Sequence, residues 1–174
     1  MQENEIKLNQ DAIIGGKDIY KIALDTRNFE ISLFWQRSNY FLVLNTAIGV
    51  GYFNAEPYAS FFLAIFGSIV SFLWFRVNLG SKFWQSRWEQ RLSIVEKEIA
   101  PSLNFFAAEK TTIYQDVEDN LDVFNHKCKL RNLLDKMTLT KPSVSLSMTI
   151  LSLLFMCIWL VFPAIIFLQK FLNQ

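Results

Sequence analysis

The stretch 38-SNYFLVLNTAIGVGYFNAEPYASFFLAIFGSIVSFLWF-75 decides the fold of this chain. Glu56 is the one charged residue in these 38 positions, and it lies in an Asn-Ala-Glu-Pro sequence that is typical of a turn. The turn divides the stretch into two apolar arms, each near the roughly 17–25 residues that a helix needs to cross a bilayer. The sequence therefore predicts a transmembrane hairpin over residues 38–75.

A third apolar run, Ser143–Leu168, has no charged residue and predicts a third transmembrane helix, which Pro163 is expected to kink. The second arm of the hairpin begins after Pro57, a residue suited to the first turn of a helix. The first arm, Ser38–Ala55, is the short one, with 18 residues. For this arm, the alternative is a buried helix of a soluble protein.

Lysine and arginine are unevenly distributed along the chain. Eleven lie between residues 76 and 141, five precede the hairpin, none lies in its turn, and Lys170 alone follows the third run. Because cytoplasmic segments carry the excess of lysine and arginine, we expect the N-terminus and residues 76–142 in the cytoplasm. The turn and the C-terminus are then outside. The net charge of +1 suggests no strongly basic surface for nucleic acid.

The expected fold class is an all-α membrane protein, a transmembrane helical hairpin plus a third transmembrane helix, with a cytoplasmic helical domain between them. The expected segments are a cytoplasmic amphipathic helix in 1–37, the hairpin in 38–75, the cytoplasmic domain in 76–142, the third transmembrane helix in 143–168 and a tail in 169–174.

Turn and helix signals add detail to these segments. Gly15-Gly16 marks the start of the first helix, which is expected to run directly into the first arm. In the middle domain, one helix should end at Ala100-Pro101. The apolar spacing from Ile113 past Cys128 toward Met137 predicts a second long helix.

Small side chains recur along the two arms at a spacing that lets helix backbones approach closely in a bilayer. They are candidates for helix packing, either within one protomer or between the protomers of an oligomer. These residues are Ala47, Gly51, Ser60, Ala64, Gly67, Ser68 and Ser71.

Uncharged polar side chains lie inside the predicted spans, where an unbonded polar group is costly. They are expected either to form hydrogen bonds between helices or to line a water-filled pore of low ion selectivity. These residues are Asn45, Thr46, Ser145, Thr149 and Ser152. No span has an acidic or basic residue in its middle, which argues against a proton relay, a charge-coupled transporter and a voltage sensor.

Three arginines can share one helical face just inside the membrane: Arg76, Arg87 and Arg91. Such a face is expected to contact lipid headgroups and fix the topology. The alternative is a cytoplasmic mouth that attracts anions or an RNA partner.

The sequence predicts neither an enzyme nor a cofactor or metal site. His126 is the one histidine, which leaves too few ligands for a zinc site. HEPN ribonucleases carry an Arg-x4-6-His motif on a helical domain, but the positions that should hold the arginine are Asp119, Asn120 and Leu121. The motif therefore fails.

The stretch Asp25–Phe53, DTRNFEISLFWQRSNYFLVLNTAIGVGYF, resembles small bacterial membrane proteins found with phage-defence genes. In particular, it is similar to the accessory membrane proteins of type VI-B CRISPR systems, which are described as HEPN-like. The resemblance implies a homo-oligomeric, ring-shaped pore in the bacterial inner membrane. It further implies membrane lipid as a partner, and an RNA-guided CRISPR nuclease as a functional partner whose detection of phage RNA leads to depolarisation.

The expected function is thus a non-enzymatic pore or effector that depolarises or permeabilises the inner membrane in antiviral defence. One alternative is a membrane-anchored binding module that recruits a cytoplasmic partner. A degenerate HEPN-type ribonuclease is the other. No direct, sequence-specific contact with nucleic acid is expected.

Overall fold

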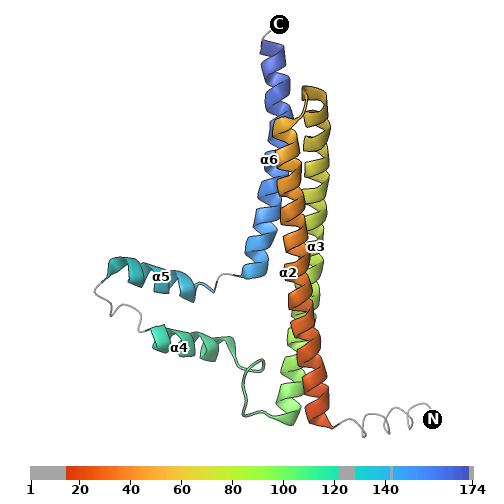
Figure 1. Cartoon of the computed structure of the whole chain (residues 1–174). Helices are drawn as coiled ribbons and strands as arrows, with labels where there is room; N and C mark the ends of the chain where they lie inside the picture. Colours follow the sequence, from red (N-terminus) through yellow and green to blue (C-terminus); the bar gives the residue numbers. More distant parts are fainter. Residues whose placement is uncertain (1–14, 122–127, 142, 173–174) are drawn as a thin grey trace, which may run out of the picture. The chain divides into compact units, whose positions relative to one another are not determined.

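The computed structural model describes residues 15–121, 128–141 and 143–172. Every regular element in these ranges is helical, which confirms the all-α class for this part of the chain (Figure 1). The helices are α2 (Gly16–Asn54), α3 (Pro57–Ile99), α4 (Lys110–Leu121), α5 (Lys129–Leu139) and α6 (Val144–Leu172). His126, Pro142, residues 1–14 and the last two residues of the expected tail lie outside the described residues.

The chain forms two compact units. The α4–α5 unit comprises residues 1–30 and 84–142, and the α6 unit comprises residues 31–83 and 143–174. The helices α2 and α3 contribute to both units, because they run for 39 and 43 residues without a break. They pass through the segment borders expected at 37/38 and 75/76, where the sequence shows a change of hydropathy but no residue that ends a helix.

A tight turn joins α2 to α3 at the expected Asn-Ala-Glu-Pro sequence. The helix α2 ends at Asn54 and α3 begins at Pro57. The hydroxyl of Ser60 donates hydrogen bonds to the carbonyl oxygens of Tyr52 and Ala55, at 2.9 and 3.1 Å. This hydroxyl satisfies carbonyl groups at the end of α2, which have no helical partner of their own.

The buried residues of α3 follow the spacing of a coiled coil. They recur in steps of four and three residues from Ser60 to Gln85, the pattern that keeps one seam of a helix against its partner. The buried positions on this seam are Ser60, Ala64, Gly67, Ser71, Trp74, Asn78, Ser81 and Gln85. Most are small or polar, so the helices approach closely along a seam that is not hydrophobic.

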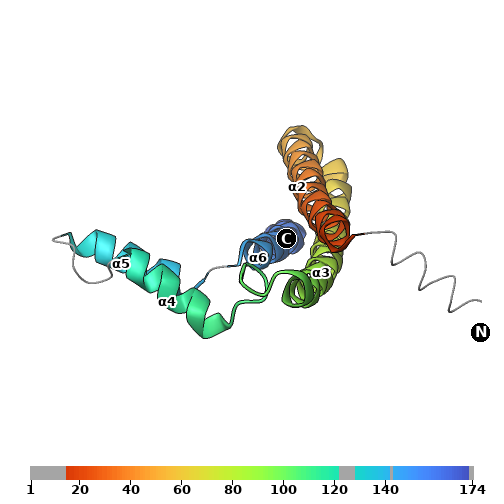
Figure 2. The ribbon, with the colours of Figure 1, turned by 90° about the horizontal axis from the view of Figure 1, so that it is seen from below.

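The helix α6 lies beside α2 and α3 in the α6 unit (Figures 1 and 2). Its buried residues Ser145, Ser152 and Trp159 are seven residues apart, which places them on one stripe. At its start, the hydroxyl of Ser143 accepts the N–H of Leu146 at 3.3 Å, as an N-cap residue does. Pro163 lies inside α6, and the helix continues to Leu172, into the segment expected to be a tail.

Two helices of the described chain, α3 and α6, are long and apolar enough to cross a membrane. The first arm of the hairpin, which belongs to α2, is not apolar enough to meet the same criterion. Three asparagines, Asn39, Asn45 and Asn54, lower its hydropathy. The hairpin therefore joins one strongly apolar arm to one of mixed character.

The predicted second long helix of the middle domain is wrong. The structure has two separate helices, α4 and α5. Cys128, directly before α5, has an extended backbone (φ −92°, ψ 115°), which no continuing helix adopts. Apolar spacing did not reveal this break, because apolar residues recur at helical intervals within α4 and again within α5.

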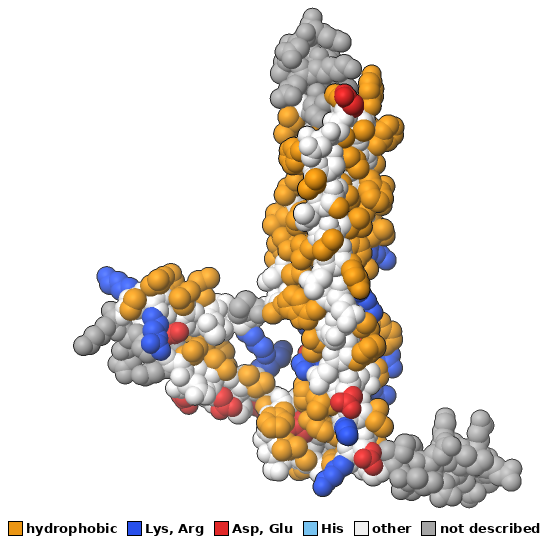
Figure 3. Space-filling model, viewed as in Figure 1, with side chains coloured by type: hydrophobic (Ala, Val, Ile, Leu, Met, Phe, Trp, Pro, Cys, Tyr) orange, Lys and Arg blue, Asp and Glu red, His pale blue; other side chains and the backbone are white. Residues whose placement is uncertain are grey.

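Large hydrophobic side chains cover the outer surface of the α6 unit (Figure 3). Examples on α3 are Phe62, Phe66 and Ile69, and examples on α6 are Leu154 and Val161. Inside the unit, the polar seam adjoins a hydrophobic core of Ile48, Ala64, Val70 and Trp159. The apolar surface outside is what distinguishes the unit from a water-soluble bundle.

Candidate functional site

One asparagine joins the three helices of the α6 unit. Asn45 in α2 is 1% exposed, and its amide nitrogen donates to the carbonyl oxygen of Phe41 at 2.9 Å. Its Oδ1 accepts two hydrogen bonds of 2.9 Å, from the hydroxyl of Ser71 in α3 and from the indole N–H of Trp159 in α6. Polar contacts of this kind hold helices together where lipid removes the hydrophobic drive for their association.

The indole of Trp159 reaches Asn45 because Gly67 leaves room for it. A Cβ at Gly67 would lie 2.6 Å from Cδ2 of the indole ring, closer than any real contact. The same indole meets the ring of Tyr52 edge-on, with centroids 5.8 Å apart, and Tyr52 stacks on Phe162 at 5.1 Å. Gly67 is therefore a packing residue within the protomer.

A second polar contact joins α3 to α6. The amide nitrogen of Asn78 donates to the carbonyl oxygen of Met148 at 3.0 Å and to the hydroxyl of Ser152 at 3.5 Å. The Ser152 hydroxyl donates in turn to the carbonyl oxygen of Thr149 at 2.7 Å. Asn78 is buried, so this contact is shielded from competing solvent.

Further along the same seam, Nη1 of Arg37 in α2 donates to the hydroxyl of Ser81 in α3 at 3.4 Å. Two buried atoms of the α6 unit, Ser38 Oγ and Trp74 Nε1, have no hydrogen-bond partner among the described residues. A buried polar atom without a partner costs about 1–3 kcal/mol.

The predicted polar residues fall into two groups. Asn45, Ser145 and Ser152 are buried between helices, and Thr149 is half-buried and donates to the carbonyl oxygen of Ser145 at 2.8 Å. Thr46 is exposed, and its hydroxyl donates to the carbonyl oxygen of Leu42 at 2.9 Å. Of these five residues, Thr46 alone faces the outside of the protomer.

Most of the predicted small residues serve packing inside one protomer. Ser60, Ala64, Gly67 and Ser71 are buried there, and Gly51 and Ser68 are half-buried. A Cβ at Gly51 would lie 3.3 Å from Leu63 Cδ1. Ala47 is exposed, so it is the member of this set that remains available to a neighbouring copy.

The three arginines of the predicted basic face are all exposed on the continuous helix α3, within about 60° of one another at 100° per residue. Arg76 belongs to the α6 unit, whereas Arg87 and Arg91 belong to the α4–α5 unit. The guanidinium of Arg87 lies 5.4 Å from the centre of the Trp84 ring. Arg91 lines a shallow, mostly apolar cavity of about 400 Å³ with Trp88, Ile22 and neighbouring residues.

A comparison with models of protein families assigns the chain to a family. The model described as the octameric membrane protein family (8xMP) matches residues 17–168, nearly the whole described chain. The chain belongs to the octameric membrane protein family. No curated protein and no solved structure matches it.

Membership of the octameric membrane protein family accounts for the apolar surface of the α6 unit. An oligomeric membrane protein covers its apolar surface with lipid and with neighbouring copies, and it keeps its polar groups bonded inside. This 8xMP chain is thus an oligomeric membrane protein, and Asn45, Asn78 and Trp159 join the helices of its α6 unit.

Glu96 is a buried residue of this 8xMP chain that was not identified from the sequence. It is 0% exposed, and its carboxylate accepts the N–H groups of Phe105 and Phe106 at 2.5 and 2.7 Å. These bonds hold the loop after α3 against the helix. Burial, and then the nearby Glu96 charge, raise the pKa of Tyr20 in α2.

Arg27 completes this cluster in the α4–α5 unit of the 8xMP chain. Its guanidinium lies 5.2 Å from the centre of the Phe106 ring, and its Nη2 is 3.7 Å from Oε1 of Glu89. A signal for Glu96 exists in the sequence, since it follows Leu92 by four residues on the buried seam of α3. An acidic residue on such a seam indicates a fixed partner, here two backbone N–H groups.

Proposed function

We propose that this protein is a non-enzymatic homo-octamer that conducts ions or small solutes across the bacterial inner membrane as an effector of antiviral defence. The match of residues 17–168 to the octameric membrane protein family supports the octameric assembly. The defence role and a functional link to an RNA-guided CRISPR nuclease rest on the resemblance of Asp25–Phe53 to type VI-B accessory proteins.

The proposed topology has three spans, with the N-terminus and residues 76–142 in the cytoplasm. The apolar exterior of α3 and α6 supports two of these spans. The first arm of the hairpin, in α2, forms the third span. One face of this arm packs against α3 and α6, and the opposite face contacts a water-filled lumen. The distribution of lysine and arginine supports the orientation.

We assign α2 to the wet axis of the assembly. Of the three helices, α2 has the arm that is too polar to face lipid alone, and it exposes Asn39, Thr46 and Asn54. Uncharged amides and hydroxyls of this kind suit a water-filled lumen with little ion selectivity. Ala47 beside Thr46 then lies close to the neighbouring copy.

Conductance of the purified full-length protein in planar bilayers tests this function. Channels of a single size are expected, and Thr46→Trp should reduce their conductance, because the larger ring narrows the lumen. Phe66→Trp is the matched control, since Phe66 is an exposed ring on α3. The proposal is wrong if the protein is monomeric in mild detergent and silent in bilayers.

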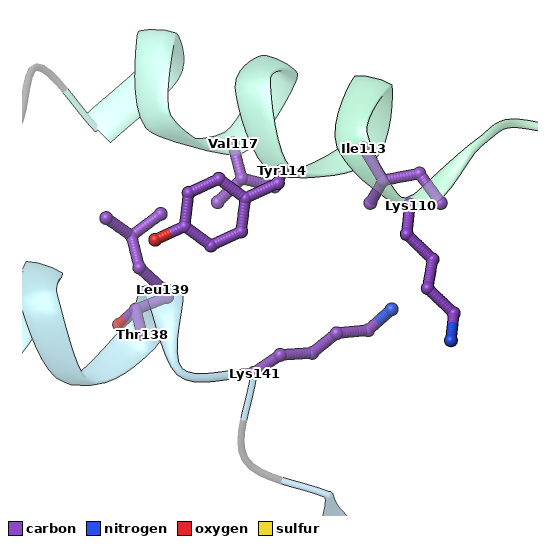
Figure 4. Close-up of a pocket in the computed structure, with 7 residues that line it drawn as sticks. All are labelled: Lys110, Ile113, Tyr114, Val117, Thr138, Leu139 and Lys141. Atoms are coloured by element: carbon purple, nitrogen blue, oxygen red, sulfur yellow. The ribbon is translucent and has the colours of Figure 1, made fainter.

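The second candidate, a membrane-anchored binding module, is favoured by one feature. A cavity of about 420 Å³ lies between α4 and α5 (Figure 4). Ile113, Tyr114, Val117 and Leu139 give it apolar walls, and Lys110 and Lys141 lie together at one end. A silent monomer that still captures a cytoplasmic partner would favour this function. Loss of RNA cleavage in His126→Ala would be needed to support a ribonuclease.

A further inference from the structure

The short helix α5 presents an apolar stripe that no described part of the α4–α5 unit covers. Leu130, Leu133, Leu134 and Met137 are between 53% and 63% exposed. Their spacing of three, four and seven residues puts them on one helical face. Four adjacent apolar side chains on an 11-residue helix form a contiguous exposed patch. Such a patch marks an interaction site, whereas single exposed apolar residues do not.

This stripe points away from α4. The half-buried residues of α5 are Asn132, Asp135 and Leu139, which lie on the opposite face of the helix at 100° per residue. Leu139 lines the cavity with Tyr114 and Val117 of α4. The packing of α5 on α4 is therefore complete without the stripe.

Basic residues flank the stripe on both sides. At 100° per residue, Lys129 and Lys136 fall along one border and Arg131 along the other. Asp135 is the one acidic residue of α5, and it lies on the face opposite the stripe. Lysine and arginine in these positions extend their heads past an apolar face toward anionic headgroups.

The chain keeps α5 next to the membrane. Leu139, its last residue, precedes Val144, the first residue of the membrane helix α6, by five positions. Five residues reach at most about 18 Å when extended. One end of α5 is thus held within reach of the headgroup layer on the side where α6 begins.

We propose that α5 lies on the surface of the membrane that α6 crosses, with its leucine and methionine stripe in the headgroup layer and its basic residues on anionic phospholipid. The proposal rests on the membrane location of the family and not on conduction. A second copy of α5 is a poorer occupant, because a symmetric contact would bring the same basic borders together. The acidic face of α4 in a neighbouring copy, with Asp116 and Asp119, is the competing occupant.

A fluorophore on the stripe tests the proposal in the full-length protein. The variant carries Met137→Cys with Cys128→Ser and Cys157→Ser, and the control carries Glu118→Cys, on the exposed face of α4, in the same background. The labelled protein is reconstituted into vesicles of phosphatidylcholine, with or without phosphatidylglycerol. Quenching is measured with doxyl-labelled lipid and with aqueous iodide.

Quenching of the Met137 probe by doxyl lipid is expected, stronger with phosphatidylglycerol, while the Glu118 probe is quenched by iodide. Adding Lys136→Glu should lower the ratio of docked to free α5 roughly fivefold or more, since each basic residue near an anionic surface contributes about that factor. A Met137 probe quenched by iodide alone overturns the proposal. A probe protected from both quenchers also overturns it, and indicates a neighbouring copy. Equal lipid quenching in both vesicles contradicts the role given to the basic residues.

Discussion

The indole N–H of Trp159 and the side-chain oxygen of Asn45 are 2.9 Å apart, although 114 residues separate them in the sequence. This hydrogen bond ties α6 to α2. Ser71 donates to the same oxygen, so one amide fixes the register of three helices at once. Because no charged group takes part, the contact needs no counter-ion among the buried side chains.

Replacing Asn45 with alanine should destabilise the protomer by about 1–3 kcal/mol, because the Trp159 N–H and the Ser71 hydroxyl lose their buried acceptor. Thermal unfolding of the detergent-purified protein measures the change. Asn39→Ala is the matched control on an exposed position of the same helix, and it should have almost no effect. Equal loss of stability in both variants would refute the role of Asn45 as a joint.

Replacing Gly67 with alanine should cost about 1–3 kcal/mol through overpacking, since the new Cβ would lie 2.6 Å from the indole of Trp159. Gly80→Ala on the same helix is the control: a Cβ there meets nothing within 4 Å. It should stabilise α3 by roughly 0.5–1 kcal/mol. A double variant with Trp159→Leu should tolerate alanine at position 67, which shows whether the ring is the cause.

Replacing Glu96 with alanine should free the loop after α3, because the N–H groups of Phe105 and Phe106 lose their acceptor. A loss of about 2–3 kcal/mol is expected for two hydrogen bonds to a carboxylate. Limited proteolysis should then cleave near residues 103–106 at a higher rate. Glu98→Ala, an exposed acidic residue two positions away, should leave the cleavage rate unchanged.

Cys128 should react with iodoacetamide at a lower pH than an ordinary thiol. The backbone N–H of Arg131, then that of Leu130, and the Arg131 charge lower the pKa of Cys128 at the start of α5. A lowered thiol pKa means that the reactive thiolate is present at a lower pH, so the rate profile shifts to the acid side. The rate is measured in Cys157→Ser, and denatured protein, which lacks α5, should give the ordinary profile.

The helix ends and turns, which depend on neighbouring residues, could be predicted from the sequence. The contacts between helices, which depend on residues far apart in the chain, could not. The turn before Pro57, the end of α3 at Ile99 and the start of α6 after Ser143 follow from local signals of proline, charge and capping. The seam contact of Asn78 was missed, because Asn78 lies past the expected end of the hairpin.

The spacing of polar residues in the sequence also does not reveal which of them are buried. Asn45 and Thr46 are neighbours of similar polarity, yet one is buried among three helices and the other is exposed. Which of them faces inward depends on where Ser71 and Trp159 lie, and these residues are far away in the chain. The separation of α4 from α5 depends on the backbone of Cys128, which apolar periodicity does not report.

The shared acceptor at Asn45 sets an order of events during synthesis. When Asn45 leaves the ribosome, Ser71 is still inside the exit tunnel and Trp159 has not been made, so the amide has no partner from another helix. The turn of two residues brings α3 alongside soon afterwards, and the Ser71 bond is then made. Only when α6 arrives is the Trp159 bond made. The Asn45 contact is therefore complete only after α6 has been made, and a chain truncated before α6 would lack the Trp159 donor.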